Sequence, residues 1–148
     1  MAELRADAES AANPEQLWRT VTDWPGQSRW IPLTRTRLVA GPEGVGARLE
    51  GWTGVGPVGF LDTMVIDVWE PPHRLVVLHT GRVVRGTAGV DIVASGSGSR
   101  LTWWEDVEPP LGAVGRALWP VGAPVATAIL RRCLRRAAFI AAEQPSQQ

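Results

Sequence analysis

The spacing of apolar residues divides the chain into three stretches. Before residue 33 it fits short helical segments, and between residues 33 and 108 apolar and polar side chains alternate with a period of two. That alternation is typical of half-buried strands. After Pro109-Pro110 the period returns to about 3.6, which predicts an amphipathic helix. The pattern therefore indicates an α+β protein that ends in a helix.

The first helix has a clear start and a clear end. Asn13 fits the N-cap position, Pro14 the first helical position and Gln16 the third, a combination typical of a capping box. Pro25 disfavours helical geometry in the residue before it, so this helix should end near Asp23. A second helical turn is predicted around residues 27–30, before Pro32.

The central stretch predicts six strands, and a weak alternation over Ala2–Ala8 adds an edge strand at the start. The six are Leu33–Val39, Val45–Trp52, Thr63–Trp69, Arg74–His79, Arg82–Val93 and Arg100–Glu108. Short Gly- and Pro-rich connections between consecutive strands favour an antiparallel sheet. One connection, Gly54–Gly59, matches the pattern G-x-G-x-x-G, but a strand follows it where a nucleotide site needs a helix. We interpret it as a flexible loop between strands, whose apolar residues could cover the mouth of a pocket.

The terminal helix should carry one apolar stripe, with Pro120 and Pro124 producing a kink or a separate short helix before it. The stripe consists of Val125, Ile129, Cys133, Ala137 and Ile140. Four arginines, at positions 131, 132, 135 and 136, occupy the other side. They are interpreted as the solvent face of a packed helix, and the alternative is an amphipathic helix that lies on anionic lipid. Residues 1–143 are predicted to form one domain, and residues 144–148 a frayed polar tail.

Seven antiparallel strands and one long helix predict a sheet that curls around the helix and leaves a pocket between them. Four segments resemble the START/SRPBCC superfamily, the polyketide cyclase/dehydrase and lipid-transport proteins. They are Asn13–Trp18, Thr22–Pro32, Val68–Arg74 and Ser99–Trp103. The resemblance covers almost the whole chain and implies the helix-grip fold. Members bind, carry or transform different hydrophobic molecules, so it implies no shared catalytic motif.

Composition narrows the function classes. Fifteen basic and fifteen acidic residues balance, so neither nucleic acid nor an anionic surface is indicated as the main partner. All the basic residues are arginines, which excludes Schiff-base and P-loop lysines. No apolar run approaches 18 residues and no signal peptide is evident, so we expect a cytoplasmic protein without stable membrane insertion. Cys133 lies on the apolar stripe and is expected to be inert core packing.

Two residues are candidates for proton transfer. His79 shares a strand face with Leu75 and Val77, and Glu105 shares one with Trp103. If these faces point inward, both side chains can act as acid or base or can orient a ligand. The alternatives are a surface position for either residue, a histidine satisfied by the backbone, or a glutamate paired with an arginine.

The eight tryptophans either fill the core or line a cavity. The set predicted to contact a ligand is Trp24, Trp30, Phe60, Met64, Ile66, Val77, Trp103 and Trp119. The histidine and cysteine spacing predicts no metal site, and no cofactor is expected.

Three functional hypotheses remain. The leading one is a module that binds or carries a small hydrophobic molecule between sheet and helix. The second is a cyclase or dehydratase that uses His79 and Glu105. The third is an interaction module with a collapsed cavity and an exposed apolar patch. The oligomeric state is left open.

Overall fold

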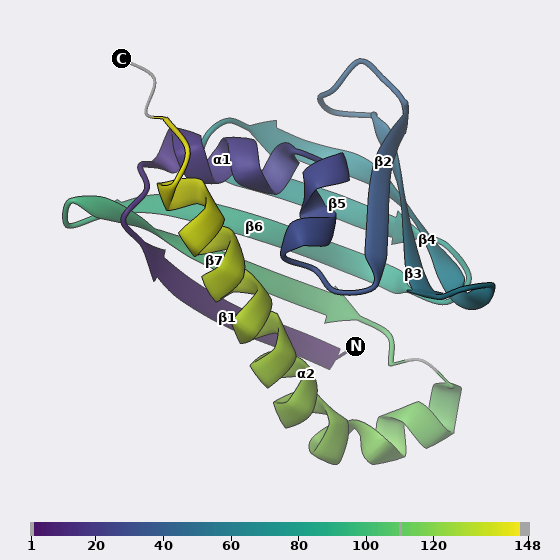
Figure 1. Cartoon of the computed structure of the whole chain (residues 1–148). Coiled ribbons are helices and arrows are strands. Elements are labelled where there is room, and N and C mark those ends of the chain that lie inside the picture. The colour runs from purple at the N-terminus through teal and green to yellow at the C-terminus, as the bar shows by residue number, and fades with distance from the viewer. Residues whose placement is uncertain (1, 110, 146–148) are drawn as a thin grey trace.

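The computed structural model describes residues 2–109 and 111–145 (Figure 1). The helices are α1 (Pro14–Thr22), the 3-10 helix η1 (Pro25–Arg29) and α2 (Gly112–Ala142). The strands are β1 (Ala2–Ser10), β2 (Thr34–Ala40), β3 (Arg48–Val55), β4 (Val58–Glu70), β5 (Arg74–Thr80), β6 (Arg85–Ser95) and β7 (Gly98–Val107). They form one antiparallel sheet in the order β1-β7-β6-β5-β4-β3-β2. The predicted helix-grip architecture is confirmed.

Local sequence accounts for α1. Asn13 accepts a hydrogen bond from the backbone N–H of Gln16 at 2.8 Å, and the Gln16 side chain accepts one from the Asn13 N–H at 2.8 Å. This reciprocal pair satisfies two donors that a helix start otherwise leaves open. The helix ends at Thr22 with Asp23 as its C-cap. The predicted start and end of α1 are therefore confirmed.

The predicted flexible loop over Gly54–Gly59 is wrong. The run Gly54–Gly59 belongs to the β3–β4 hairpin, with Gly54 paired to Gly59 and only Gly56-Pro57 forming the turn. A Cβ atom on Gly54 would collide with the backbone carbonyl of Val58, so the close approach of the two strands requires glycine. The glycines here allow two backbones to pair and do not produce a loop.

Strand β4 contains a bulge between Ile66 and Val68, which leaves Asp67 without a partner residue on β5. Before the bulge Met64 and Ile66 face the interior, and after it Trp69 packs against the core. The Trp69 ring lies edge-on to Trp18 with centroids 5.0 Å apart. The bulge takes Asp67 out of the pairing, so the side chains on both sides of it still face inward.

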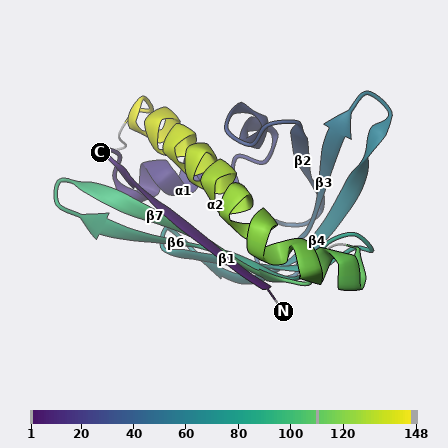
Figure 2. The same ribbon diagram turned by 90° about the horizontal axis from the view of Figure 1, so that it is seen from below.

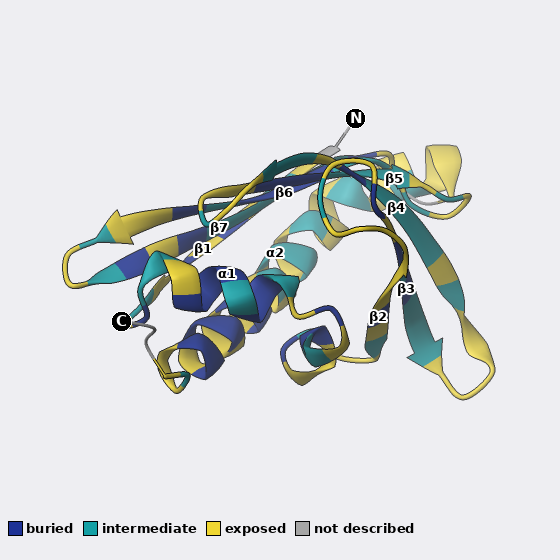
Figure 3. Cartoon of the chain, turned by 90° about the horizontal axis from the view of Figure 1, so that it is seen from above, coloured by how far each residue is buried: buried dark blue, intermediate teal, exposed yellow. Residues whose placement is uncertain are grey.

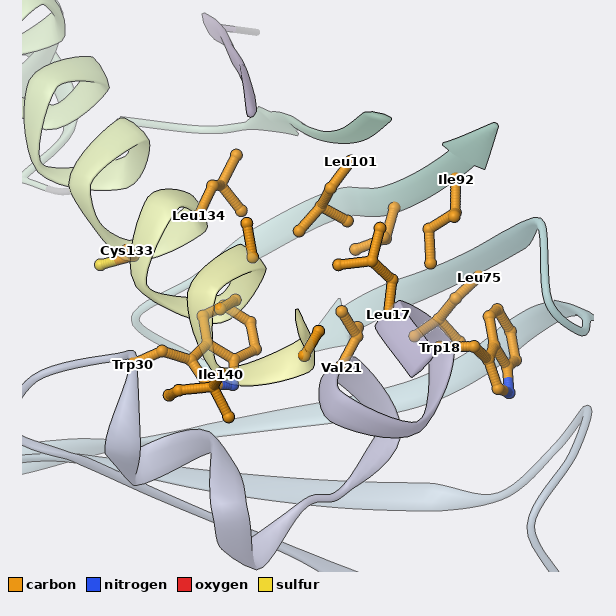
Figure 4. Close-up of a cluster of buried hydrophobic side chains, with 14 of the residues drawn as sticks. Leu17, Trp18, Val21, Trp30, Leu75, Ile92, Leu101, Cys133, Leu134 and Ile140 are labelled. Carbon is orange, nitrogen blue, oxygen red and sulfur yellow. The ribbon is translucent and has the colours of Figure 1, made fainter. Parts of the chain in front are cut away.

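The core lies where α1, the end of α2 and the sheet meet (Figure 4). Leu17, Ile92, Leu101 and Leu134 are fully buried there. Cys133 is buried as predicted, and burial raises the pKa of its thiol.

Helix α2 is held at its C-terminal end. The Ser10 hydroxyl donates to the carbonyl of Ala138 at 2.7 Å, and the Gln16 side chain donates to the carbonyl of Gln144 at 2.6 Å. Arg19 donates to the carbonyl of Pro145 at 2.8 Å. The first two residues of the predicted frayed tail are therefore bonded to α1, and residues 146–148 lie outside the described residues.

The first half of α2 leaves the domain. Figures 1 and 2 show the helix bending near its two internal prolines and following β1 along the rest of its length. Val125 and Ile129 are more than half exposed, so their predicted place in a buried stripe is wrong (Figure 3). The helix is long and apolar enough to cross a membrane by length and composition alone, with a mean hydropathy of 1.3 over an unburied window. We did not expect this property, because arginines interrupt the apolar runs of this segment.

Candidate functional site

A partly open cavity of about 220 Å³ lies on the concave face of the sheet. Its apolar lining comes from the sheet and from the segment containing α1 and η1, and it comprises Val21, Trp24, Ile31, Leu49, Met64, Leu75, Val77, Ala88, Val90 and Trp103. Its polar side chains are Gln27, Thr34, Thr36, Thr53, Asp62, His79 and Glu105. The volume is below the roughly 300–1,000 Å³ typical of ligand sites in proteins.

Helix α2 contributes no lining residue among the described part of the chain. The predicted pocket between the sheet and the terminal helix is therefore displaced: it lies between the sheet and the α1–η1 segment. The cause is the placement of α2, which packs along β1 at the edge of the sheet and on α1, and lies apart from strands β3 to β5 (Figure 1).

Small residues create the space on the sheet. Gly51 on β3 faces the cavity, and a Cβ atom there would meet its nearest neighbours, Met64 and Thr36, at 3.8 and 3.9 Å. These are ordinary contact distances, so a larger side chain at position 51 extends into the cavity without backbone strain. Ala88 on β6 lies between Val77 and Glu105 and is equally small.

The strand register brings His79 and Asp62 together. His79 on β5 pairs with Met64 on β4, and Asp62 lies two residues further along β4 on the same face. Diagonal neighbours of this kind are within reach across an antiparallel pair. The Nδ1 atom of His79 lies 2.8 Å from the Oδ1 atom of Asp62, and the two side chains are only 6% and 18% exposed.

This contact orients the imidazole. A carboxylate only accepts hydrogen bonds, so the proton of His79 is assigned to Nδ1 and the neutral ring offers Nε2 as an acceptor. The Nε2 atom is buried and has no hydrogen-bond partner within residues 2–109 and 111–145. Trp24, which also lines the cavity, has a buried Nε1 donor without a partner in the same residues.

Glu105 faces the cavity from β7 and is half-buried. Its Oε1 atom accepts a hydrogen bond from the Trp103 indole at 3.1 Å, and the Trp103 ring lies edge-on to Trp30 with centroids 6.0 Å apart. His79 and Glu105 share the concave face but not a contact. The sheet register places their Cα atoms two strands and two residues apart, which is about 12 Å for standard strand spacing.

The structure brings only some of the predicted ligand-contacting residues to the cavity. Trp24, Met64, Val77 and Trp103 line it. The other four do not, and they are Trp30, Phe60, Ile66 and Trp119.

These four residues lie outside the cavity for different reasons. Trp30 is core packing behind Trp103, and Ile66 is fully buried at the bulge of β4. Phe60 lies towards the hairpin tip, beyond the hollow. Trp119 lies in the first half of α2, which leaves the domain.

Asp62 is the residue that sequence reasoning missed. It lies two residues before Met64, just ahead of the predicted strand Thr63–Trp69. The alternation of that strand, extended back, predicts an inward carboxylate at position 62 and is the signal that would have found it. Within the described residues, no group of three His, Cys, Asp or Glu side chains has the geometry of a metal site.

The bent sheet, the two short helices after β1 and the long terminal helix define a helix-grip protein. Its cavity lies on the concave face of the sheet and is partly open. The chain belongs to the family described as polyketide cyclase / dehydrase and lipid transport, whose sequence model matches residues 1–138. The resemblance to the START/SRPBCC superfamily is thereby confirmed.

Solved structures support the fold. A protein from Thermus thermophilus is 17% identical and superimposes with a TM-score of 0.76, covering 95% of this chain and 97% of its own. A protein from Chromobacterium violaceum is 13% identical with a TM-score of 0.71, covering 96% and 98%. One from Rhodobacter sphaeroides is 21% identical with a TM-score of 0.68, covering 92% and 88%. A search of curated proteins gives no match.

Proposed function

We propose that the protein binds a small, mainly apolar molecule that carries at least one oxygen function, in the cavity on the concave face of its sheet. The observation that carries the proposal is the combination of an apolar wall with two unpartnered buried polar atoms, Nε2 of His79 and Nε1 of Trp24. Apolar burial supplies affinity, and a few polar groups fix orientation. The family, whose description includes lipid transport, supports the same class of ligand.

The unpartnered atoms indicate what the ligand offers. A buried donor or acceptor without a partner costs about 1–3 kcal/mol. The indole N–H of Trp24 only donates, so it suits a carbonyl or hydroxyl oxygen. The Nε2 atom of a neutral His79 accepts, so it suits a hydroxyl hydrogen. A hydroxylated or hydroxycarbonyl compound satisfies both.

Native mass spectrometry of the freshly purified protein tests for a co-purified ligand, and calorimetry tests binding directly. We expect β-naphthol to bind more tightly than naphthalene, because only the hydroxyl compound can satisfy the buried polar atoms. Equal affinity for the two would contradict the role given to His79 and Trp24.

Two adjacent tryptophans provide a matched pair of variants. Trp103 lines the cavity, whereas Trp104 lies on the opposite face of β7 and donates its indole N–H to Asp91 at 3.2 Å. Trp103→Ala should weaken naphthol binding at least tenfold, and Trp104→Ala should leave it within a factor of two, which follows from the apolar area a cavity indole contributes. Equal effects would refute the assignment of the cavity.

Filling the hollow is an independent test. Gly51→Val extends a side chain into the cavity, and Gly122→Val makes the same change on α2, where a Cβ atom has no neighbour within 4 Å. We expect the first variant to abolish binding and the second to retain it. Binding that survives Gly51→Val would place the ligand elsewhere.

A second candidate function, proton-transfer catalysis, is favoured by the His79–Asp62 contact. A carboxylate that holds the Nδ1 proton leaves Nε2 free to take a proton from a ligand. In a dehydration, Nε2 would remove the proton α to a carbonyl while the bond from the β carbon to its hydroxyl breaks. Glu105 in its acid form would supply the proton that lets the hydroxyl leave as water. Exchange with solvent then restores both groups.

The aldol adduct of benzaldehyde and acetone is a probe that separates binding from catalysis, because its loss of water gives a conjugated ketone that is followed by absorbance. Catalysis predicts turnover that His79→Gln abolishes and Asp62→Asn reduces. Binding of the adduct without turnover would support the binding function and would exclude this dehydration.

A further inference from the structure

An apolar stripe runs along the outer side of the first half of α2. It consists of Val114, Leu118, Val121, Val125 and Ile129, at spacings of three and four residues that align them on one helix face. Each of the five is 54–74% exposed. At about 1.5 Å per residue these positions cover roughly 22 Å along the helix, which bends within the stripe near Pro120 and Pro124. A soluble domain rarely exposes so long an apolar face.

The stripe faces away from the domain. The less exposed residues of the same stretch include Gly115, Trp119, Ala126 and Leu130, and they occupy the opposite side of the helix. Figure 3 shows exposed and intermediate residues alternating along this half of α2, with no buried residue. A swing of the helix towards the sheet would therefore bury the inner side and leave the stripe uncovered.

Arginines continue the stripe. Arg132 and Arg136 follow Ile129 at the same spacing, and Arg131 and Arg135 flank them. All four are exposed, and no described ion pair includes any of them. With Arg116, the range 112–142 holds five arginines and no acidic residue, a formal charge of +5. Apolar residues and unopposed arginines on one helix are the composition of interfacial helices.

We propose that α2 docks the protein on an anionic membrane surface, with the stripe of five apolar side chains buried at the boundary of the headgroups and acyl chains. Arg132 and Arg136 then lie at the level of the phosphate groups. The apolar contact is strengthened by charge complementarity that a zwitterionic surface does not provide.

The topology decides how the helix lies. Strand β7 ends at Val107 and α2 begins at Gly112, while the C-terminal end of the helix is hydrogen bonded to α1. Both ends of the apolar half are thus joined to the same folded domain, so the helix lies along the surface and does not cross it. A second copy of the chain is a poorer occupant, because pairing two such helices brings together two segments of charge +5.

Vesicle flotation of the full chain tests the proposal. We expect the protein to float with vesicles of equal parts phosphatidylcholine and phosphatidylserine and to stay behind with phosphatidylcholine alone. Each arginine near an anionic surface contributes roughly a fivefold change in partitioning, so Arg132→Gln with Arg136→Gln should lower it roughly 25-fold. Arg82→Gln, an exposed arginine on a loop between strands, is the matched control and should change it by less than fivefold.

The apolar half is tested by Leu118→Ser with Val125→Ser, against Val45→Ser with Val58→Ser at exposed positions on the sheet side. Only the first pair should abolish flotation. Equal flotation with both vesicle types, or no difference between the pairs, would overturn the proposal. The proposal would also be overturned if the protein did not float and sedimentation showed a dimer that Leu118→Ser dissociates.

The proposal does not depend on the ligand of the cavity. Gly51→Val should leave flotation unchanged, so the failure of one proposal does not decide the other.

Discussion

Replacing Gln16 tests how the two helices are held together. This 7% exposed side chain accepts from the Asn13 N–H at 2.8 Å and donates to the Gln144 carbonyl at 2.6 Å. Gln16→Ala removes both hydrogen bonds and leaves a buried donor and acceptor to find water. A net value near 1 kcal/mol for each bond gives a loss of about 2 kcal/mol in the free energy of unfolding.

Gln16→Glu separates the two bonds. A glutamate still accepts from the Asn13 N–H and completes the capping box, but it cannot donate to Gln144. We expect this variant to lose about 1 kcal/mol, half the effect of Gln16→Ala.

Urea unfolding followed by circular dichroism measures the free energies, and calorimetry gives the midpoints. For a chain of this length a loss of about 2 kcal/mol corresponds to a fall in Tm of roughly 4–8 °C. Two results would refute the reasoning: a loss below about 0.5 kcal/mol for Gln16→Ala, or a Gln16→Glu variant as unstable as the alanine variant.

Three further predictions concern the core and the sheet. Burial raises the pKa of the Cys133 thiol, so iodoacetamide at neutral pH should label the native protein far more slowly than the urea-unfolded one. Leu134→Ala, at a fully buried position, should cost about 2–5 kcal/mol in urea unfolding. Gly89→Ala places a Cβ atom against the Trp104 ring, so it should cost about 1–3 kcal/mol and change the near-ultraviolet circular dichroism of that indole.

The sequence predicted the fold well where local chemistry and packing agree. Asn13 and Gln16 fix the start of α1 through contacts only three residues apart. The period of two predicted seven strands because most of them face the core on one side and solvent on the other. The loop predicted over Gly54–Gly59 was wrong because glycine is equally compatible with a loop and with the close pairing of two strands.

The cavity was predicted less well than the fold. The alternation along the strands correctly directed Met64, Val77 and Trp103 to the concave face. The prediction for Trp119 was wrong because the residues around it do not indicate that the first half of α2 lies away from the concave face of the sheet. The contact between Asp62 and His79 depends on the register of β4 against β5, which periodicity alone does not fix.

The bulge on β4 gives one strand two separate tasks. On one side of Asp67 the strand supplies Asp62 and Met64 to the binding hollow, and on the other it supplies Trp69 to the indole cluster that supports α1. A strict two-residue repeat that kept Asp67 in the pairing would turn either the cavity residues or Trp69 outward. By taking one extra residue out of the pairing with β5, the bulge lets cavity-lining and core-packing side chains face the interior from one continuous strand.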